Sequence, residues 1–151
     1  MPDVRLRVAG SGDHLDALKD LAARLGLADR VDFMGFVTEQ QKIEMLRQVH
    51  VVANPSSKEG WGVTVIEANA CGTPVVASNV PGLRDAVVDG ETGILVPYGD
   101  VEALARELIE VLRDDARREN LAGNALEWAA KFSWDASAEG ILAEIGKVTG
   151  A

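Results

Sequence analysis

Two glutamates, Glu59 and Glu67, are the side chains of this sequence best placed for chemistry, with seven residues between them. A carboxylate accepts hydrogen bonds readily from sugar hydroxyls or from the diol of a ribose. Gly60 and Gly62 lie between the glutamates and carry no side chain, so unpaired backbone N–H groups at a helix start could approach a phosphate. The segment therefore predicts a site for a ligand that carries both hydroxyls and phosphates.

The two glutamates are expected on different elements. The apolar run at residues 50–53 is followed by Asn, Pro and Ser, which indicates a parallel strand that ends in a loop carrying Glu59. Residues 62–71 predict the next helix. Side chains tilt toward the N-terminus of a helix, so Glu67 can reach back toward a ligand seated at that end. One carboxylate is then placed to hold a sugar and the other a ribose.

Strands and helices alternate along the rest of the chain. Asp13 and Asp100 are predicted to cap two of the helices, and Thr38 and Gln41 have the spacing of a capping box. This order predicts an α/β fold with a doubly wound, Rossmann-like parallel sheet flanked by helices, in a single domain over residues 1–151. A stretch punctuated by Gly and Pro separates the last two strands. Strands are expected at 4–8, 31–34, 50–53, 74–78 and 92–97, and helices at 15–25, 38–49, 62–71, 101–112, 116–131 and 133–148, the helical C-terminus spanning 114–148.

Composition narrows the classes of partner. The formal net charge of −9 disfavours nucleic acid and anionic membrane surfaces as partners. Cys71 is the only cysteine, so neither an intramolecular disulfide nor a cysteine metal cluster can form, and a cytoplasmic location is expected. His14 and His50 have no neighbours at ligand spacing, so no metal site is predicted. No apolar stretch is long enough to predict a membrane span.

The segment from Glu59 to Glu67 resembles the E-x7-E signature of family 4 glycosyltransferases, which have the GT-B fold of two facing Rossmann-like domains. Residues 70–78, 89–97, 99–100 and 132–134 resemble further stretches of that family, so the resemblance covers essentially the whole chain. It implies the C-terminal, donor-binding half of a retaining glycosyltransferase. The implied reaction needs no metal or other cofactor, and it moves a hexosyl group from a UDP-, GDP- or ADP-sugar to an unknown acceptor.

The resemblance also implies roles for individual residues. Glu59 would be the catalytic residue and would contact hydroxyls of the donor sugar, whereas Glu67 would bind the ribose. Gly10 and Gly12 are turn residues with room to line the cleft, and Leu15 stands where a dinucleotide-binding fingerprint needs its third glycine. The other implied donor-binding residues are Gly60, Trp61, Gly62, Val63 and Thr64 at the sugar and phosphates, and Phe36 and Val37 beside the base.

The role of Trp61 is open at this stage. Its ring can stack on a sugar, or it can pack the loop against the core.

This chain departs from the family at its N-terminus. The family places an Arg and a Lys, which neutralise the leaving diphosphate, before the point that matches the start of this sequence. Residues 2–4 resemble the start of that domain's second strand, so its first strand and helix and the acceptor-binding N-terminal domain are expected to be missing. Without these cations the chain alone is expected to turn over poorly or not at all.

Three other expectations follow from that departure. An open sheet edge tends to recruit another strand, which predicts a homodimer or a strand swap. The alternative to a donor-binding part is a non-catalytic truncated or engineered fragment that acts only as a folding or interaction module. A third alternative is a half-enzyme completed by another chain.

Overall fold

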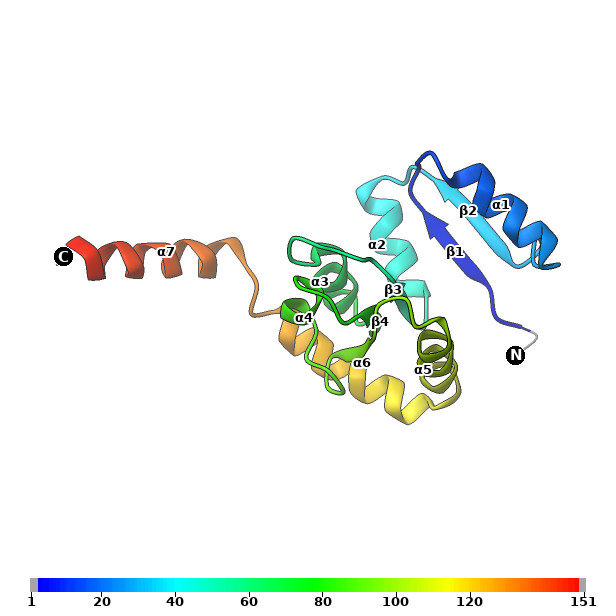
Figure 1. The fold of residues 1–151 in the computed structure, drawn as a ribbon. Coiled ribbons are helices and arrows are strands. Elements are labelled where there is room, and N and C mark those ends of the chain that lie inside the picture. The colour runs from blue at the N-terminus through cyan, green and yellow to red at the C-terminus, as the bar shows by residue number, and fades with distance from the viewer. Residues whose placement is uncertain (1–2, 150–151) are drawn as a thin grey trace. The chain divides into compact units, whose positions relative to one another are not determined.

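The chain is an α/β protein, and its computed structural model describes residues 3–149. It divides into two compact units, Met1–Met45 and Leu46–Ala151, and each unit has its own parallel sheet. The predicted fold class is confirmed, whereas a single domain over residues 1–151 stays a prediction. In chain order the elements are β1 (Leu6–Ala9), α1 (Leu15–Arg24), β2 (Val31–Gly35), α2 (Glu39–Gln48), β3 (Val52–Asn54), α3 (Val63–Ala70), β4 (Val75–Ser78), α4 (Leu83–Ala86), β5 (Gly93–Val96), α5 (Val101–Arg113), α6 (Asp115–Ala129) and α7 (Trp134–Thr149) (Figure 1).

The first unit is built on the pair β1–β2. The strands run parallel, with Leu6 opposite Val31. The predicted capping box at the start of α2 is confirmed: the Thr38 N–H donates to Gln41 Oε1 at 2.9 Å, and the Gln41 N–H donates to Thr38 Oγ1 at 3.3 Å.

The predicted cap of α1 is wrong. The N-cap residue is His14 and not Asp13, and it makes no side-chain cap hydrogen bond. The physical reason is a backbone turn just before the helix, in which the Leu15 N–H donates to the carbonyl oxygen of Gly12 at 3.1 Å. The helix consequently begins one residue later than a cap at Asp13 requires.

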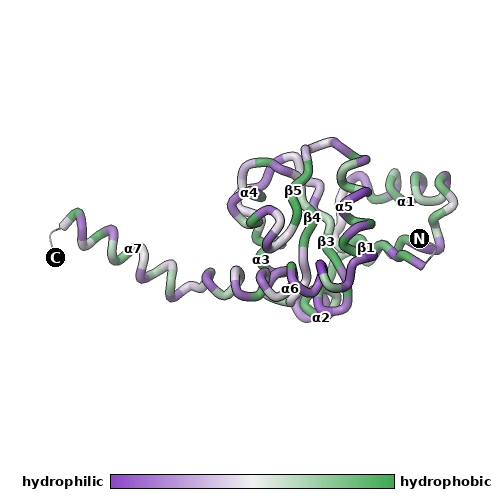
Figure 2. The backbone as a smooth tube through the Cα atoms, turned by 90° about the horizontal axis from the view of Figure 1, so that it is seen from below, coloured by the Kyte–Doolittle hydropathy of each residue, from purple (hydrophilic) through white to green (hydrophobic). Residues whose placement is uncertain are grey.

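The second unit is built on three parallel strands in the order β3–β4–β5. Every residue of the central strand β4 is buried, as expected for an apolar run covered on both faces. Figure 2 shows the apolar character of β4 and β5. On β4, Val75 and Ala77 pack with α3 and α4, while Val76 packs with α5. Helices therefore cover both faces of this sheet, as a doubly wound arrangement requires.

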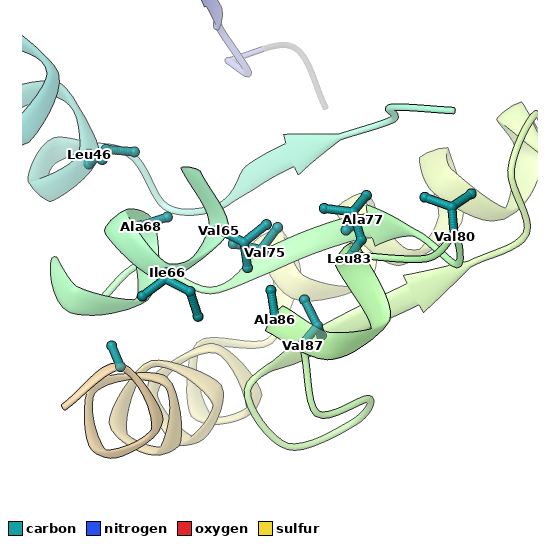
Figure 3. Close-up of a cluster of buried hydrophobic side chains, with 11 residues drawn as sticks. Leu46, Val65, Ile66, Ala68, Val75, Ala77, Val80, Leu83, Ala86 and Val87 are labelled. Atoms are coloured by element: carbon teal, nitrogen blue, oxygen red, sulfur yellow. The ribbon is translucent and has the colours of Figure 1, made fainter. Parts of the chain in front are cut away.

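The larger core of the second unit lies between β4 and helices α3 and α4 (Figure 3). Val65 and Leu83 are completely buried in it, and Trp61 packs against its edge. The full set of buried residues is Leu46, Val65, Ile66, Ala68, Val75, Ala77, Val80, Leu83, Ala86, Val87 and Ala129.

Two helices of the second unit begin at aspartate caps. Asp100 Oδ1 accepts the Ala103 N–H at 2.8 Å, which confirms the predicted cap of α5, and Asp114 Oδ1 accepts the Arg117 N–H at 2.9 Å at the start of α6. The short helix α4 was not predicted.

The last helix, α7, contains no buried residue. Several of its apolar side chains are exposed to solvent: Trp134 is 92% exposed, Leu142 67% and Val148 87%. Among the helices of residues 3–149, none has the length and apolar character needed to cross a bilayer.

Candidate functional site

The loop between β3 and α3 carries Glu59 and is organised by its own side chains. Asn54, the last residue of β3, accepts the Ser56 N–H through Oδ1 at 3.2 Å. The Ser56 hydroxyl in turn donates to Glu59 Oε1 at 2.8 Å. Glu59 is half-buried, so its carboxylate is oriented by the loop and still reachable from solvent. One carboxylate oxygen is partnered in this way, and the other can accept from a ligand hydroxyl.

Helix α3 starts at Gly62 in a way that leaves its N-terminal end free of side-chain caps. Gly62 has a φ of +77° and makes no side-chain cap hydrogen bond. The first N–H groups of a helix have no partner within the helix, and they point along its positive end. Val63 and Thr64 in this first turn are exposed, and the turn holds no acidic residue. An anion can therefore approach the helix start without charge repulsion from that turn.

Gly62 is buried against the core, so a larger residue at this position would crowd its neighbours. A Cβ atom there would lie 3.0 Å from Leu83 Cδ2 and 3.2 Å from Ala86 Cβ. The positive φ favours glycine for a second, independent reason.

Glu67 lies in the middle of α3, half-buried between the buried residues Ile66 and Ala68. The structure thus places the two glutamates and the five predicted site residues between them on one continuous piece of the second unit. Glu59, Gly60, Trp61 and Gly62 lie on the loop, and Val63, Thr64 and Glu67 lie on α3.

Trp61 packs against Phe132, which follows the C-terminal end of α6. Its ring meets that of Phe132 edge-on at 4.8 Å between centroids, and Phe132 meets Trp128 in the same way at 5.2 Å. Trp61 is half-buried beside the larger core. Of the two alternatives for Trp61, the structure favours packing of the loop against the core.

The remaining predicted residues belong to the first unit. Phe36 follows β2 and is 82% exposed, and Val37 beside it is half-buried. Gly10 follows β1 with a φ of +125° and donates its N–H to the carbonyl oxygen of Gly35 at 2.7 Å. Neither Gly10 nor Gly12 has an atom within 4 Å of an added Cβ. These features leave their predicted part in ligand binding open, and it stays a prediction.

Sequence reasoning missed the support behind the loop, which comes from Gly82 and α4. A Cβ atom at Gly82 would lie 2.4 Å from the carbonyl oxygen of Glu59. The sequence did indicate a turn at this point, since a Pro-Gly pair, here Pro81 and Gly82, is typical of turns. What it touches lies 23 residues earlier in the chain, and no local pattern predicts that.

Two further features bear on the site. Within residues 3–149, no group of three or more His, Cys, Asp or Glu residues is arranged to hold a metal ion.

A surface hollow of about 910 Å³ lies along the exposed side of α5, with Val101, Ile109 and Arg113 in its lining. It includes no residue of the loop or of α3, so it is separate from the two glutamates.

Comparison with protein families gives a match over most of the chain. The family described as glycosyl transferases group 1 matches residues 1–128. The D-inositol 3-phosphate glycosyltransferase of Mycobacteroides abscessus is 43% identical over 153 residues, which cover 97% of this chain and 34% of that protein. The same-named protein of Stackebrandtia nassauensis is 42% identical over 96% of this chain and 34% of its own length. The chain thus spans about a third of the length of these relatives.

Solved structures give the same picture. Anabaena Alr3699/HepE in complex with UDP has a TM-score of 0.87 at 28% identity, over 97% of this chain and 42% of that one. The same protein in complex with UDP-glucose has a TM-score of 0.81 at 29% identity, over 87% and 37% of the two chains. Sucrose-phosphate synthase from Thermosynechococcus elongatus has a TM-score of 0.85 at 33% identity, over 97% and 39%.

Proposed function

The chain belongs to the glycosyl transferases group 1 family and has the fold of the Rossmann-like C-terminal half of a GT-B glycosyltransferase, and from that premise we propose that it binds the UDP-sugar donor of a longer, retaining enzyme. In this proposal the loop before α3 and the first half of α3 form the donor site. The hexosyl group then passes to an acceptor held by a domain outside this chain.

The observation that carries the proposal is the placement of two half-buried glutamates on either side of an uncapped helix start. Glu59 is oriented by the Ser56 hydroxyl on the loop, and Glu67 lies within α3. Gly62 begins the helix without a side chain that could occupy its N–H groups. A ligand with a sugar, a diphosphate and a ribose matches these three features in order.

The proposed mechanism assigns one task to each part. Glu59 accepts hydrogen bonds from hydroxyls of the donor sugar and fixes the anomeric carbon relative to the acceptor. The N–H groups at the start of α3 stabilise negative charge that develops on the leaving diphosphate. Glu67 holds the ribose diol. The Arg and Lys that the family resemblance implies would add positive charge from outside this chain, without a metal ion.

UDP is the nucleotide favoured over GDP and ADP. The Anabaena protein that resembles this chain at 28% and 29% identity was solved with UDP and with UDP-glucose. Carried to this chain, that likeness supports a uracil base.

A second candidate is a non-catalytic fragment in which the site is inherited but does not bind. The observation that favours it is the short span of the chain, about a third of the length of its curated relatives.

Calorimetric titration separates the two candidates. UDP, GDP, ADP and UDP-glucose are titrated into the chain, into Glu67→Gln and into the control Glu119→Ala, an exposed glutamate of α6. We expect saturable binding of UDP that Glu67→Gln weakens about tenfold or more, because a charged hydrogen bond to the ribose is lost. Glu119→Ala should bind as the original chain does. No heat with any nucleotide, from a chain shown to be folded by circular dichroism, rejects donor binding and supports the fragment.

A further inference from the structure

The loop that carries Glu59 rests directly on Gly82. This glycine is buried and has a φ of +85°. An added Cβ would lie 2.4 Å from the carbonyl oxygen of Glu59, 2.9 Å from its carbonyl carbon and 3.1 Å from that of Gly60. All three contacts are to backbone, which cannot swing aside as the end of a side chain can. The peptide between Glu59 and Gly60 therefore occupies the space that any other residue at position 82 would need.

The other end of the loop rests on the helix that Gly82 begins. The nearest atoms to a Cβ built on Gly62 are Leu83 Cδ2 at 3.0 Å, Ala86 Cβ at 3.2 Å and the carbonyl oxygen of Gly82 at 3.6 Å. Both ends of the segment from Glu59 to Gly62 are thus seated on the short stretch from Gly82 to Ala86.

That stretch is itself fixed in the core. Leu83 and Ala86 are completely buried and pack with β4 and α3, as Figure 3 shows. The Trp128 indole N–H donates to the carbonyl oxygen of Ala86 at 3.0 Å, which ties α4 to α6. A close-packed interior resists displacement, so a change of size at position 82 has to move the loop rather than the core.

We propose that Gly82 is a positioning residue: its missing side chain sets where the Glu59–Gly60 peptide lies, and thereby how the donor sugar is held. The inference rests on the proposed donor site. It adds that the sugar part of the ligand, and not its nucleotide part, depends on the seat formed by Gly82 and α4.

The sugar and nucleotide parts of the ligand are expected to respond differently because the residues proposed to hold the sugar contact Gly82. Glu59 and Gly60 rest on Gly82 itself, and they are proposed to lie at the sugar. Glu67 lies farther along α3 and is proposed to hold the ribose. Displacing the loop should therefore reduce the additional affinity that the sugar gives, while the nucleotide keeps its contacts on α3.

The test compares Gly82→Ala with Gly90→Ala. Both glycines have a positive φ, +85° and +78°, so both variants place a side chain on a backbone conformation that disfavours one. Only at Gly82 does the added methyl meet other atoms, because nothing lies within 4 Å of a Cβ at Gly90. The dissociation constants for UDP and UDP-glucose are measured by calorimetry for each variant. Gly82→Ala should raise the ratio of the UDP-glucose constant to the UDP constant about tenfold, and Gly90→Ala should leave it unchanged. An equal loss for both ligands, or no loss, overturns the proposal.

An NMR readout separates this proposal from the function on which it rests. If the folded chain binds neither UDP nor UDP-glucose, the proposed function fails. The amide resonances of Glu59 and Gly60 then test the seat alone. They should move in Gly82→Ala and stay in place in Gly90→Ala, and unmoved resonances in Gly82→Ala overturn the seat.

Trp128→Phe provides a second route if Gly82→Ala does not fold. It removes the hydrogen bond to Ala86 but keeps an aromatic ring beside Phe132. The matched control is Trp134→Phe, since Trp134 is 92% exposed on α7. We expect Trp128→Phe to raise the same ratio about twofold to threefold and to shift the Gly60 amide, and Trp134→Phe to do neither. An unchanged ratio together with an unmoved Gly60 amide in Trp128→Phe overturns the role of α4.

Discussion

At the scale of single residues, Asn69 is the side chain of α3 whose environment fits it least. It is completely buried, and neither its amide nitrogen nor its amide oxygen has a hydrogen-bond partner among the described residues. Burying polar groups without partners destabilises a fold by about 1–3 kcal/mol on mutational scales. A residue of similar branching without polar atoms should therefore suit this position better.

We expect Asn69→Leu to raise the free energy of unfolding by about 1 kcal/mol, since the relief is reduced by the larger methyl groups. Urea denaturation measures the difference. Asn124→Leu is the matched control, because the Asn124 amide donates to the carbonyl oxygen of Glu91 at 3.2 Å, and this variant should gain no stability. A clear loss of stability in Asn69→Leu would contradict this prediction.

Individual residues differ in how far the sequence determines their role. The spacing of Glu59 and Glu67 pointed to them only together with the glycines between them. The strand and the helix around them have strong local patterns, which predicted a loop for Glu59 and a helix for Glu67. Trp61 stayed open in the sequence because its packing partner, Phe132, lies 71 residues away. Gly82 was missed for the same reason, since its contact with Glu59 is made only by the folded chain.

At the scale of elements, the cap of α5 is a local interaction with a measurable effect. Asp100 Oδ1 accepts the Ala103 N–H, one of the donors that a helix start leaves without a backbone partner. Asp100→Ala should lower the free energy of unfolding by about 1 kcal/mol. Asp85→Ala is the control, because Asp85 is exposed on α4 and is not a cap, and it should change stability by less than about 0.5 kcal/mol. Equal losses in urea denaturation for the two variants would contradict a specific role of the cap.

Elements with a local signal were predicted well, and those fixed by tertiary contacts were not. The capping box of α2 and the apolar strand β4 were recognised from neighbouring residues. Helix α4 has only four residues, too few to show a helical period. The bond from Trp128 to Ala86 that holds it spans 42 positions of the chain. The cap at Asp13 was predicted wrongly because a backbone turn at Gly12 took the place of the side chain.

At the scale of the whole molecule, the strands form two sheets instead of one. Among the described residues, β1 pairs only with β2, and β3 pairs only with β4. Both β1 and β3 therefore have one edge without a partner strand.

Unpaired strand edges and the bare apolar face of α7 are two different reasons for the chain to associate with itself. We expect a dimer, because an open edge offers a row of backbone N–H and C=O groups to another strand. Light scattering over a range of concentrations measures the mass, and a monomer throughout would contradict the prediction. Leu142→Glu tells the two causes apart, because Leu142 is 67% exposed on a helix without buried residues. Pairing through the strand edges should survive this change, whereas association through α7 should be lost when a charge enters its apolar face.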